Sequence, residues 1–140
     1  MLPTKFTVRV YGILINDNNE VLLADEIIRG RHITKFPGGG LEFGEGPHEC
    51  VLREFREETG QEVSVVNHFY TTDFYIHSEI NPEFQVVAIY YKVSCKTLSE
   101  IEVNTEKDKL TLRWVSLSSL GENDVTFESD KAVVRLLSLL

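Results

Sequence analysis

The chain has 140 residues, of which 42% are hydrophobic, and its net charge is −8. This length fits a single domain spanning residues 1–140, and the hydrophobic content is enough for one core, which argues against disorder. The acidic balance argues against sequence-independent binding to a nucleic-acid polymer, because such binding needs clustered Lys and Arg.

Targeting and membrane signals are not found in the sequence. Residues 1–5 lead directly into a strand-like pattern, and no apolar run is long enough to span a bilayer. Cys50 and Cys95 have no metal-ligand spacing and are too few for a disulfide framework, so two reduced thiols are expected. We therefore expect a cytoplasmic protein without a membrane partner. The sequence leaves the oligomeric state open, a homodimer included.

The first forty residues predict a hairpin, a loop and an irregular turn. Residues 6–15 are rich in β-branched and aromatic types, and the asparagine-rich segment 16–19 predicts a turn before a returning strand at 20–24. Residues 25–35 are predicted to form a polar loop. The sequence Phe-Pro-Gly-Gly-Gly at 36–40 is expected to be irregular, because no regular element tolerates it well.

A helix is predicted from Pro47 to just before Gly60. Proline suits the first helical position and glycine suits the C-terminal cap. Val51, Leu52 and Phe55 fall at helical spacing and predict its buried side. Strand-like runs follow at 62–66, 69–76, 84–93 and 110–115. A second helix is predicted over 129–140, with Ser129 or Asp130 as its cap. This mixture predicts an α/β or α+β fold in which helices cover a mixed sheet.

The predicted helix carries three acids on one side. Glu54, Glu57 and Glu58 stand at i, i+3 and i+4, so their carboxylates share one face. Like charges in this arrangement destabilise a helix by roughly 0.2–0.5 kcal/mol per pair, and a charged surface is the simplest explanation of such a run. Mg²⁺, however, is bound by clustered carboxylate oxygens. Glu45 before the helix and the adjacent glycines favour a cation site over a solvated surface.

The stretch from Gly39 to Gln61 resembles the Nudix box. That box consists of Gly, five residues, Glu, seven residues and then Arg-Glu-apolar-x-Glu-Glu-x-Gly-apolar. This chain has Gly39, Glu45 and Arg53-Glu54-Phe55-Arg56-Glu57-Glu58-Thr59-Gly60 in that spacing. The one departure is Gln61, where the family prefers an apolar residue; it affects the packing of the helix end and leaves the metal site unchanged. The rest of the chain also fits the MutT-like order of elements, which implies a single Nudix hydrolase domain with an α/β/α sandwich fold.

The resemblance implies a set of roles for the box. Oxygen atoms of the Gly38 carbonyl, Glu54, Glu57 and Glu58 are expected to bind Mg²⁺, or Mn²⁺, and Arg53 is expected to position Glu57. Glu45 is expected to support the loop before the helix. The implied chemistry is hydrolysis of a pyrophosphate bond, with Glu54 as the first choice for the base.

The substrate is expected to be a small nucleotide. Arg29, Arg31 and Lys35 in the predicted loop are candidates to hold its outer phosphates, although a solvated basic loop explains them equally well. Aromatic residues on the predicted strands are candidates to stack on a base, but such residues more often belong to a core. They are Tyr70, Phe74, Tyr75 and Phe84. Trp114 is interpreted as packing, and His48 and His77 as surface residues.

Three alternatives remain from sequence. A (deoxy)nucleoside triphosphate is favoured over a nucleotide sugar or an ADP-ribose-like diester. A non-catalytic nucleotide sensor is a further rival, but this chain keeps every box glutamate.

MutT-like relatives place an acid outside the box, shortly before a tryptophan, near the metal. Asp108 is the candidate here, compared with Glu106, although Lys107 and Lys109 also fit an ordinary mixed-charge turn.

Overall fold

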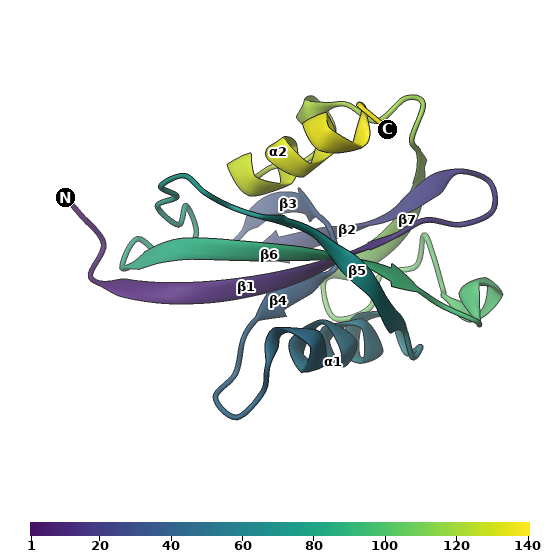
Figure 1. The fold of residues 1–140 in the computed structure, drawn as a ribbon, viewed down its shortest axis with the longest axis horizontal. Helices are drawn as coiled ribbons and strands as arrows, with labels where there is room; N and C mark the ends of the chain where they lie inside the picture. Colours follow the sequence, from purple (N-terminus) through teal and green to yellow (C-terminus); the bar gives the residue numbers. More distant parts are fainter.

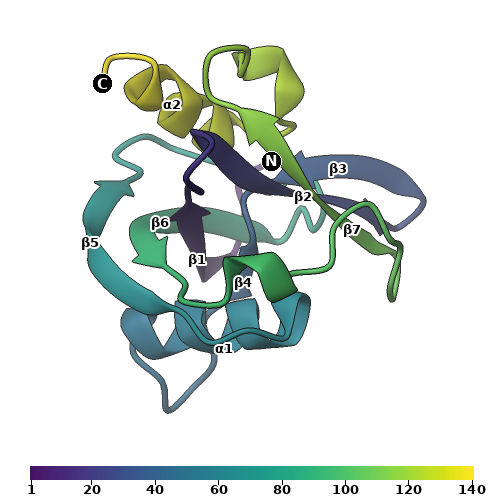
Figure 2. The ribbon, with the colours of Figure 1, turned by 90° about the vertical axis from the view of Figure 1, so that its right-hand side faces the viewer.

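The computed structural model describes residues 1–140, with two groups of strands between two helices (Figures 1 and 2). A four-stranded sheet has the order β4-β1-β6-β5, and a three-stranded sheet has the order β3-β2-β7. The α/β sandwich with a mixed sheet is therefore confirmed. The strands are β1 Lys5–Leu14, β2 Glu20–Ile28, β3 Arg31–Lys35, β4 Gly38–Gly40, β5 Ser64–Thr71, β6 Phe84–Ser94 and β7 Leu110–Ser116, and the helices are α1 Pro47–Thr59 and α2 Glu128–Leu137.

Strand β1 lies at the centre of the larger sheet. It pairs in parallel with β6 over its whole length and antiparallel with β4. The predicted turn after β1 is confirmed: the Asn16 side-chain oxygen accepts hydrogen bonds from the main-chain N–H groups of Asn18 and Glu20, each at 3.0 Å. Asn19 adopts a left-handed conformation with φ 59°. Short polar side chains that bond their own backbone favour such a turn.

The structure corrects the loop predicted over residues 25–35. Strand β2 continues to Ile28, Arg29 and Gly30 make a turn with φ 51° and 75°, and β3 returns along β2. The polar residues that suggested a loop pair with each other on the sheet: Thr34 donates to Asp25 at 2.6 Å, and Arg113 of β7 bonds the same carboxylate at 2.6 Å. Polar partners on neighbouring strands replace the apolar alternation by which a strand is identified.

Three other expectations also change. Gly38–Gly40 forms a short edge strand paired with β1. The runs at 62–66 and 69–76 are one strand, β5, and residues 72–83 lead to β6 without a strand of their own. Helix α2 begins at Glu128 with Phe127 as its cap. Ser129 and Asp130 are buried beside the Tyr90 hydroxyl, which donates to Asp130 at 2.5 Å. These two residues therefore anchor the helix to β6 and do not cap it.

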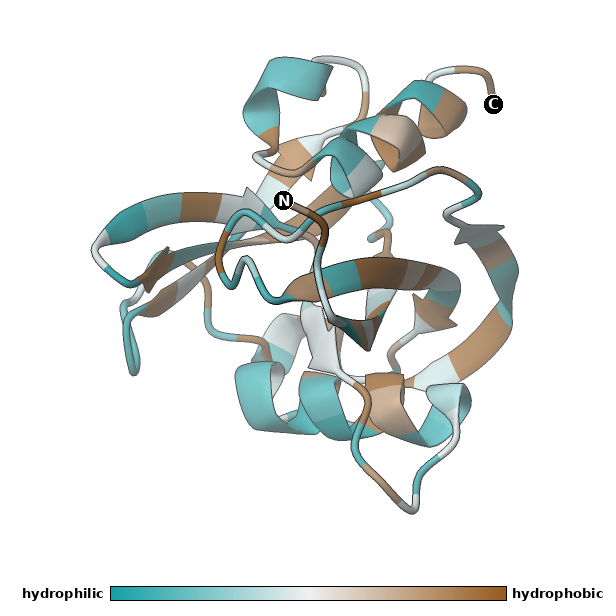
Figure 3. Ribbon diagram, turned by 90° about the vertical axis from the view of Figure 1, so that its left-hand side faces the viewer, coloured by the Kyte–Doolittle hydropathy of each residue, from teal (hydrophilic) through white to brown (hydrophobic).

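Each helix covers one side of the strands. Helix α1 begins at Pro47 and ends at the left-handed Gly60, as predicted, and it buries Cys50, Val51 and Phe55. A Cβ atom at Gly12 would lie 2.3 Å from the Phe55 ring, so glycine allows α1 to approach β1 closely. Helix α2 covers the opposite side. The central strands are predominantly hydrophobic and much of α1 is hydrophilic (Figure 3). Neither helix has the length and apolar content needed to cross a membrane.

Candidate active site

Helix α1 presents its acids to the glycine strand. The Glu54 and Glu58 side chains are 16% and 11% exposed, whereas Glu57 is 58% exposed. A Cβ atom at Gly39 would lie 2.5 Å from a Glu54 carboxylate oxygen, and the Gly38 N–H donates to Glu58 Oε2 at 3.0 Å. Gly39 is therefore required because the Glu54 carboxylate lies directly against β4, whereas a Cβ atom at Gly38 would lie 2.2 Å from the Val10 carbonyl of β1.

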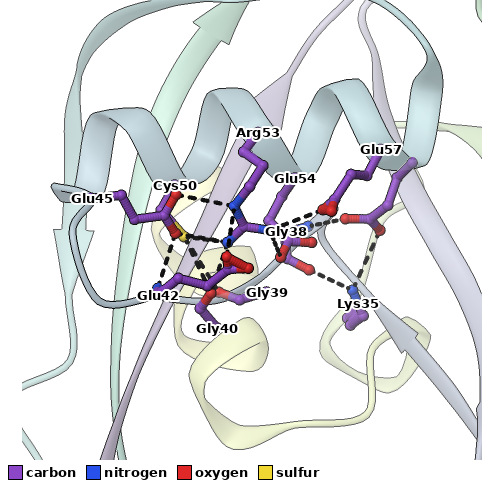
Figure 4. A network of polar contacts seen from close by, with 11 residues as sticks. Lys35, Gly38, Gly39, Gly40, Glu42, Glu45, Cys50, Arg53, Glu54 and Glu57 are labelled. Carbon is purple, nitrogen blue, oxygen red and sulfur yellow. Dashed lines mark hydrogen bonds and ion pairs between the residues drawn. The ribbon is translucent and has the colours of Figure 1, made fainter.

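Arg53 joins the acids of the box into one network (Figure 4). Its Nη1 lies 3.0 Å from Glu54 Oε2 and 2.9 Å from Glu57 Oε2. Its Nε and Nη2 form a two-point contact with Glu45 at 3.0 and 2.7 Å, and Nη2 also donates to the Gly40 carbonyl. Hydrogen bonding to Arg53 lowers the pKa of Glu45 to about 2. Arg53 therefore contacts Glu57 and also fixes the loop before the helix.

Lys35 lies in a different place from the one expected of a loop cation. Its side chain is 3% exposed, and Nζ donates to the Gly38 carbonyl at 3.1 Å. The same Nζ is 3.6 Å from Glu58 Oε1 and 3.6 Å from Glu26 Oε1. Burial disfavours its charge, but attraction to Glu58, Tyr11 and Glu26 outweighs burial and leaves the pKa of Lys35 raised. The ammonium therefore contacts oxygen atoms that the box resemblance assigns to a metal.

The oxygen atoms around Glu58 fit a bound cation. Glu58 Oε1 is buried without a hydrogen-bond partner, and burial raises the pKa of this carboxyl to about 7 although Lys35 lies nearby. The donors here are carboxylate and carbonyl oxygens, the set that Mg²⁺ prefers. No three His, Cys, Asp or Glu side chains already form a closed metal site. The residues match the chemistry of a divalent ion, and Arg53 and Lys35 supply the nearest positive charges.

A cavity of about 670 Å³ adjoins β4 and β1. Phe74, Tyr75 and Phe84 line it, whereas Tyr70 does not. The basic residues of the β2–β3 hairpin divide in the same way. Lys35 lines the cavity, but Arg29 donates to the Ile80 carbonyl at 3.1 Å and Arg31 pairs with Glu79 at 2.9 Å. Arg29 and Arg31 therefore hold the segment at the rim of the cavity.

Arg9 of β1 lines the same cavity, and the sequence analysis overlooked it. It belongs to no motif. The one available signal is its position in an apolar strand, on the same face as Thr7 and Tyr11. A charged residue inside a strand otherwise rich in apolar residues indicates a polar feature beside the core.

A second cleft, of about 290 Å³, lies beside Glu57 and Glu58. The connection between β6 and β7 contributes Glu100, Glu102 and Lys107 to its walls. Asp108 is exposed and is not among the lining residues. The structure therefore brings Glu100 and Glu102 of this connection to one cleft with Glu57 and Glu58, and Asp108, the candidate from the sequence, lies outside that cleft.

The remaining expectations concern packing. Trp114 packs against the core next to α1, as interpreted from the sequence. His48 is exposed and lies edge-on to the Tyr91 ring, and both cysteines are free, with burial raising the pKa of Cys50 to about 12. The Gln61 side chain accepts a hydrogen bond from Thr97 at 2.7 Å. This bond shows how a polar residue is accommodated where the family prefers an apolar one.

Comparison with known proteins identifies the family. Residues 5–137 match the family model of the NUDIX domain. The chain is 50% identical over 48 residues to the RNA pyrophosphohydrolase of Acinetobacter baylyi, covering 34% of this chain and 28% of that protein. It is 41% identical over 51 residues to the 8-oxo-dGTP diphosphatase of Escherichia coli, covering 35% and 40%. The MutT protein structure from Methanosarcina mazei has a TM-score of 0.76 at 21% identity, covering 99% and 97%.

The chain therefore belongs to the Nudix family of hydrolases. The aligned stretches span less than half the length of the two curated relatives. At 21% identity the M. mazei structure is evidence for the fold alone.

Proposed function

We propose that this protein hydrolyses a pyrophosphate bond in a small nucleotide, preferably a (deoxy)nucleoside triphosphate, with Mg²⁺ or Mn²⁺ as cofactor. The observation that carries the proposal is the buried Glu58 carboxylate beside the Gly38 main chain, with one oxygen that no hydrogen bond satisfies. The cation nearest to this oxygen is the Lys35 ammonium at 3.6 Å, beyond hydrogen-bond distance, so the oxygen can still accept a metal ion. Glu54 at Gly39 and Glu57 on the same helix complete an oxygen-rich surface.

The residues that would hold the ion are the Gly38 carbonyl, Glu54, Glu57 and Glu58. A divalent ion bound there would neutralise phosphate charge and make water a better nucleophile. In the reaction, water oxygen forms a bond to one phosphorus while the bond from that phosphorus to the bridging oxygen breaks. The proton of the attacking water passes to a carboxylate, for which Glu54 is proposed. Arg53 keeps Glu54 and Glu57 in position through its contacts at 3.0 and 2.9 Å.

The cavity beside β4 supports a nucleotide as substrate. Its volume of about 670 Å³ lies within the range of small-molecule sites, and its aromatic residues suit a base. The net charge of −8 disfavours a nucleic-acid polymer. The names of the two curated relatives indicate substrates to include in a test: RNA and 8-oxo-dGTP. Nucleotide sugars and ADP-ribose represent the alternative diester class.

The test is a substrate panel in which the released nucleotide, phosphate and pyrophosphate are separated and quantified by chromatography, with Mg²⁺ or with EDTA. We expect hydrolysis of a nucleoside triphosphate that requires metal, and a rate lower by orders of magnitude in Glu57→Gln and Glu58→Gln. Glu83→Gln, an exposed acid away from the box, is the matched control. Binding of Mn²⁺, followed by its paramagnetic resonance, should weaken in the two box variants alone. Full activity in EDTA, or unchanged Mn²⁺ binding in both variants, would refute the proposal.

A further inference from the structure

The cavity has two chemically different ends. The register of β1 places Arg9 opposite Gly40 and Tyr11 opposite Gly38, so this end adjoins the box strand. Farther along β1, Thr7 lies opposite Val86, and residues of the 72–83 segment close the other end. The start of α2 lies over the end beside β4, because Tyr90, which stacks on Tyr11, donates to Ser129 at 3.0 Å. The end beside β4 is therefore the one from which a bound molecule can reach the box carboxylates.

Arg9 at this inner end forms no ion pair with an acid. Its Nε lies 3.1 Å from the Tyr11 hydroxyl, and its guanidinium stands 5.9 Å from the Tyr11 ring centre. No ion pair and no other hydrogen bond involves the Arg9 side chain, so both Nη groups are free. The other arginines, except Arg29, each contact a carboxylate, and Arg29 donates to a main-chain carbonyl. A half-buried guanidinium with two free donors fits a planar pair of anionic oxygens.

The other cation of the cavity cannot take this role. The Lys35 ammonium already contacts the Gly38 carbonyl and the carboxylates of Glu26 and Glu58. The outer end carries Glu79 of the 72–83 segment, which lines the cavity and is paired with Arg31 at 2.9 Å. Because the arginine there is already paired, the outer end has no free arginine for a phosphate, and Phe74 and Tyr75 of the 72–83 segment suit an uncharged base. The charges of the cavity therefore point a nucleotide in one direction.

We infer that Arg9 binds the phosphate group attached directly to the nucleoside, through its two free Nη groups, and thereby directs the remaining phosphates to the box. The inference rests on the proposed function, because it assumes that the cavity takes a nucleotide. It adds a binding residue outside the box and a direction for the substrate. The base lies outward among the aromatic side chains, and the bond to be broken lies inward, beside β4. Arg9 is a contact made before and during the reaction, so its loss should affect binding more than turnover.

The test compares binding of a phosphate with binding of the same molecule without it. The full chain is titrated in EDTA with the 5′-monophosphates of adenosine, guanosine, cytidine and uridine, and with the four parent nucleosides. In the unmodified protein, at least one monophosphate should bind about tenfold or more tightly than its nucleoside, the preference that a charge-assisted two-point contact supplies. Arg9→Gln should remove most of this preference and leave nucleoside affinity unchanged. Arg9→Lys should keep part of it, because the charge remains and the two-point geometry is lost.

Arg135→Gln is the matched control, because Arg135 pairs with Glu122 on the surface and does not line the cavity. It should keep the full preference for the monophosphate. A phosphate preference that persists in Arg9→Gln, or that is missing from the unmodified protein, would overturn the inference. The binding assay contains no metal and needs no turnover, so its outcome is separate from that of the hydrolysis test. If hydrolysis is found and Arg9→Gln leaves KM unchanged, Arg9 has no role even though the proposed function stands.

Discussion

Replacing Asp130 with Asn should make the protein more stable at neutral pH. Asp130, in the first turn of α2, is fully buried. Its Oδ1 accepts a hydrogen bond from the Tyr90 hydroxyl, and its Oδ2 has no hydrogen-bond partner. Burial raises the pKa of this carboxyl to about 7, against 3.8 for an ordinary aspartate, and the Tyr90 hydrogen bond opposes the rise only in part. The ionised group therefore costs folding free energy, whereas the Asn side chain keeps the shape and an acceptor for Tyr90 without the charge.

The magnitude and its sign follow from proton linkage. Below pH 3.8 the carboxyl is protonated in both folded and unfolded chains, so it imposes no penalty there. As the pH rises towards 7 the unfolded chain ionises first, and the free energy of unfolding falls. The loss from this group is roughly 2 kcal/mol at pH 5 and roughly 4 kcal/mol at pH 8. Asp130→Asn removes the penalty, so its advantage over the unmodified protein should grow across this range.

Urea denaturation followed by Trp114 fluorescence at pH 5, 6, 7 and 8 measures this difference. Trp114 is the single tryptophan and is partly buried beside the core. Asp17→Asn, in the exposed turn after β1, is the control and should show a small difference that does not change with pH. If the stability difference between Asp130→Asn and the unmodified protein were the same at all four pH values, the reasoning about buried charge would be refuted.

Two further predictions concern the loops around the site. Glu102→Gln should lower kcat more than Asp108→Asn does, because Glu102 lines the cleft with Glu57 and Glu58. Both values of kcat are measured under saturating Mg²⁺. A loss of kcat confined to Asp108→Asn would show that Asp108, and not Glu102, acts at the box. Arg29→Ala or Arg31→Ala should raise KM a few-fold, and change kcat less, because each loosens the segment at the rim of the cavity. Unchanged KM and kcat in both variants would show that these rim contacts have no role in substrate binding.

Helix α1 was predictable because its signals are local. Pro47 at its start, Gly60 at its end and the buried residues between them depend on neighbours within a few positions. The box spacing has the same property, because helical geometry alone brings its acids to one face. Arg53 was also placed correctly beside Glu57, since the two residues are one turn apart.

The β2–β3 hairpin and Arg9 were missed because their structure depends on partners distant in sequence. Asp25 and Arg113 are far apart in the chain, and only the sheet makes them neighbours. Arg9 lies near the box because β1 pairs with β4 and places Arg9 opposite Gly40. No local sequence pattern predicts this pairing. Strand propensity depends on packing against neighbouring strands. A prediction from composition therefore does not identify polar strands whose partners are complementary polar residues.

Lys35 illustrates why the family motif alone does not describe this site. The box accounts for Arg53, which balances Glu54 and Glu57, but the deepest carboxylate, Glu58, has its nearest positive charge on Lys35 outside the box. Without these two cations the acids of α1 would repel one another against the apolar side of the strands. Both cations contact main-chain carbonyls of β4 as well, at Gly40 and Gly38. The glycine strand, the helix and the two cations therefore form one charge-balanced unit, in which a metal ion would compete with Lys35 for the Gly38 carbonyl and Glu58. Metal affinity in this protein should consequently depend on Lys35, a residue outside the box.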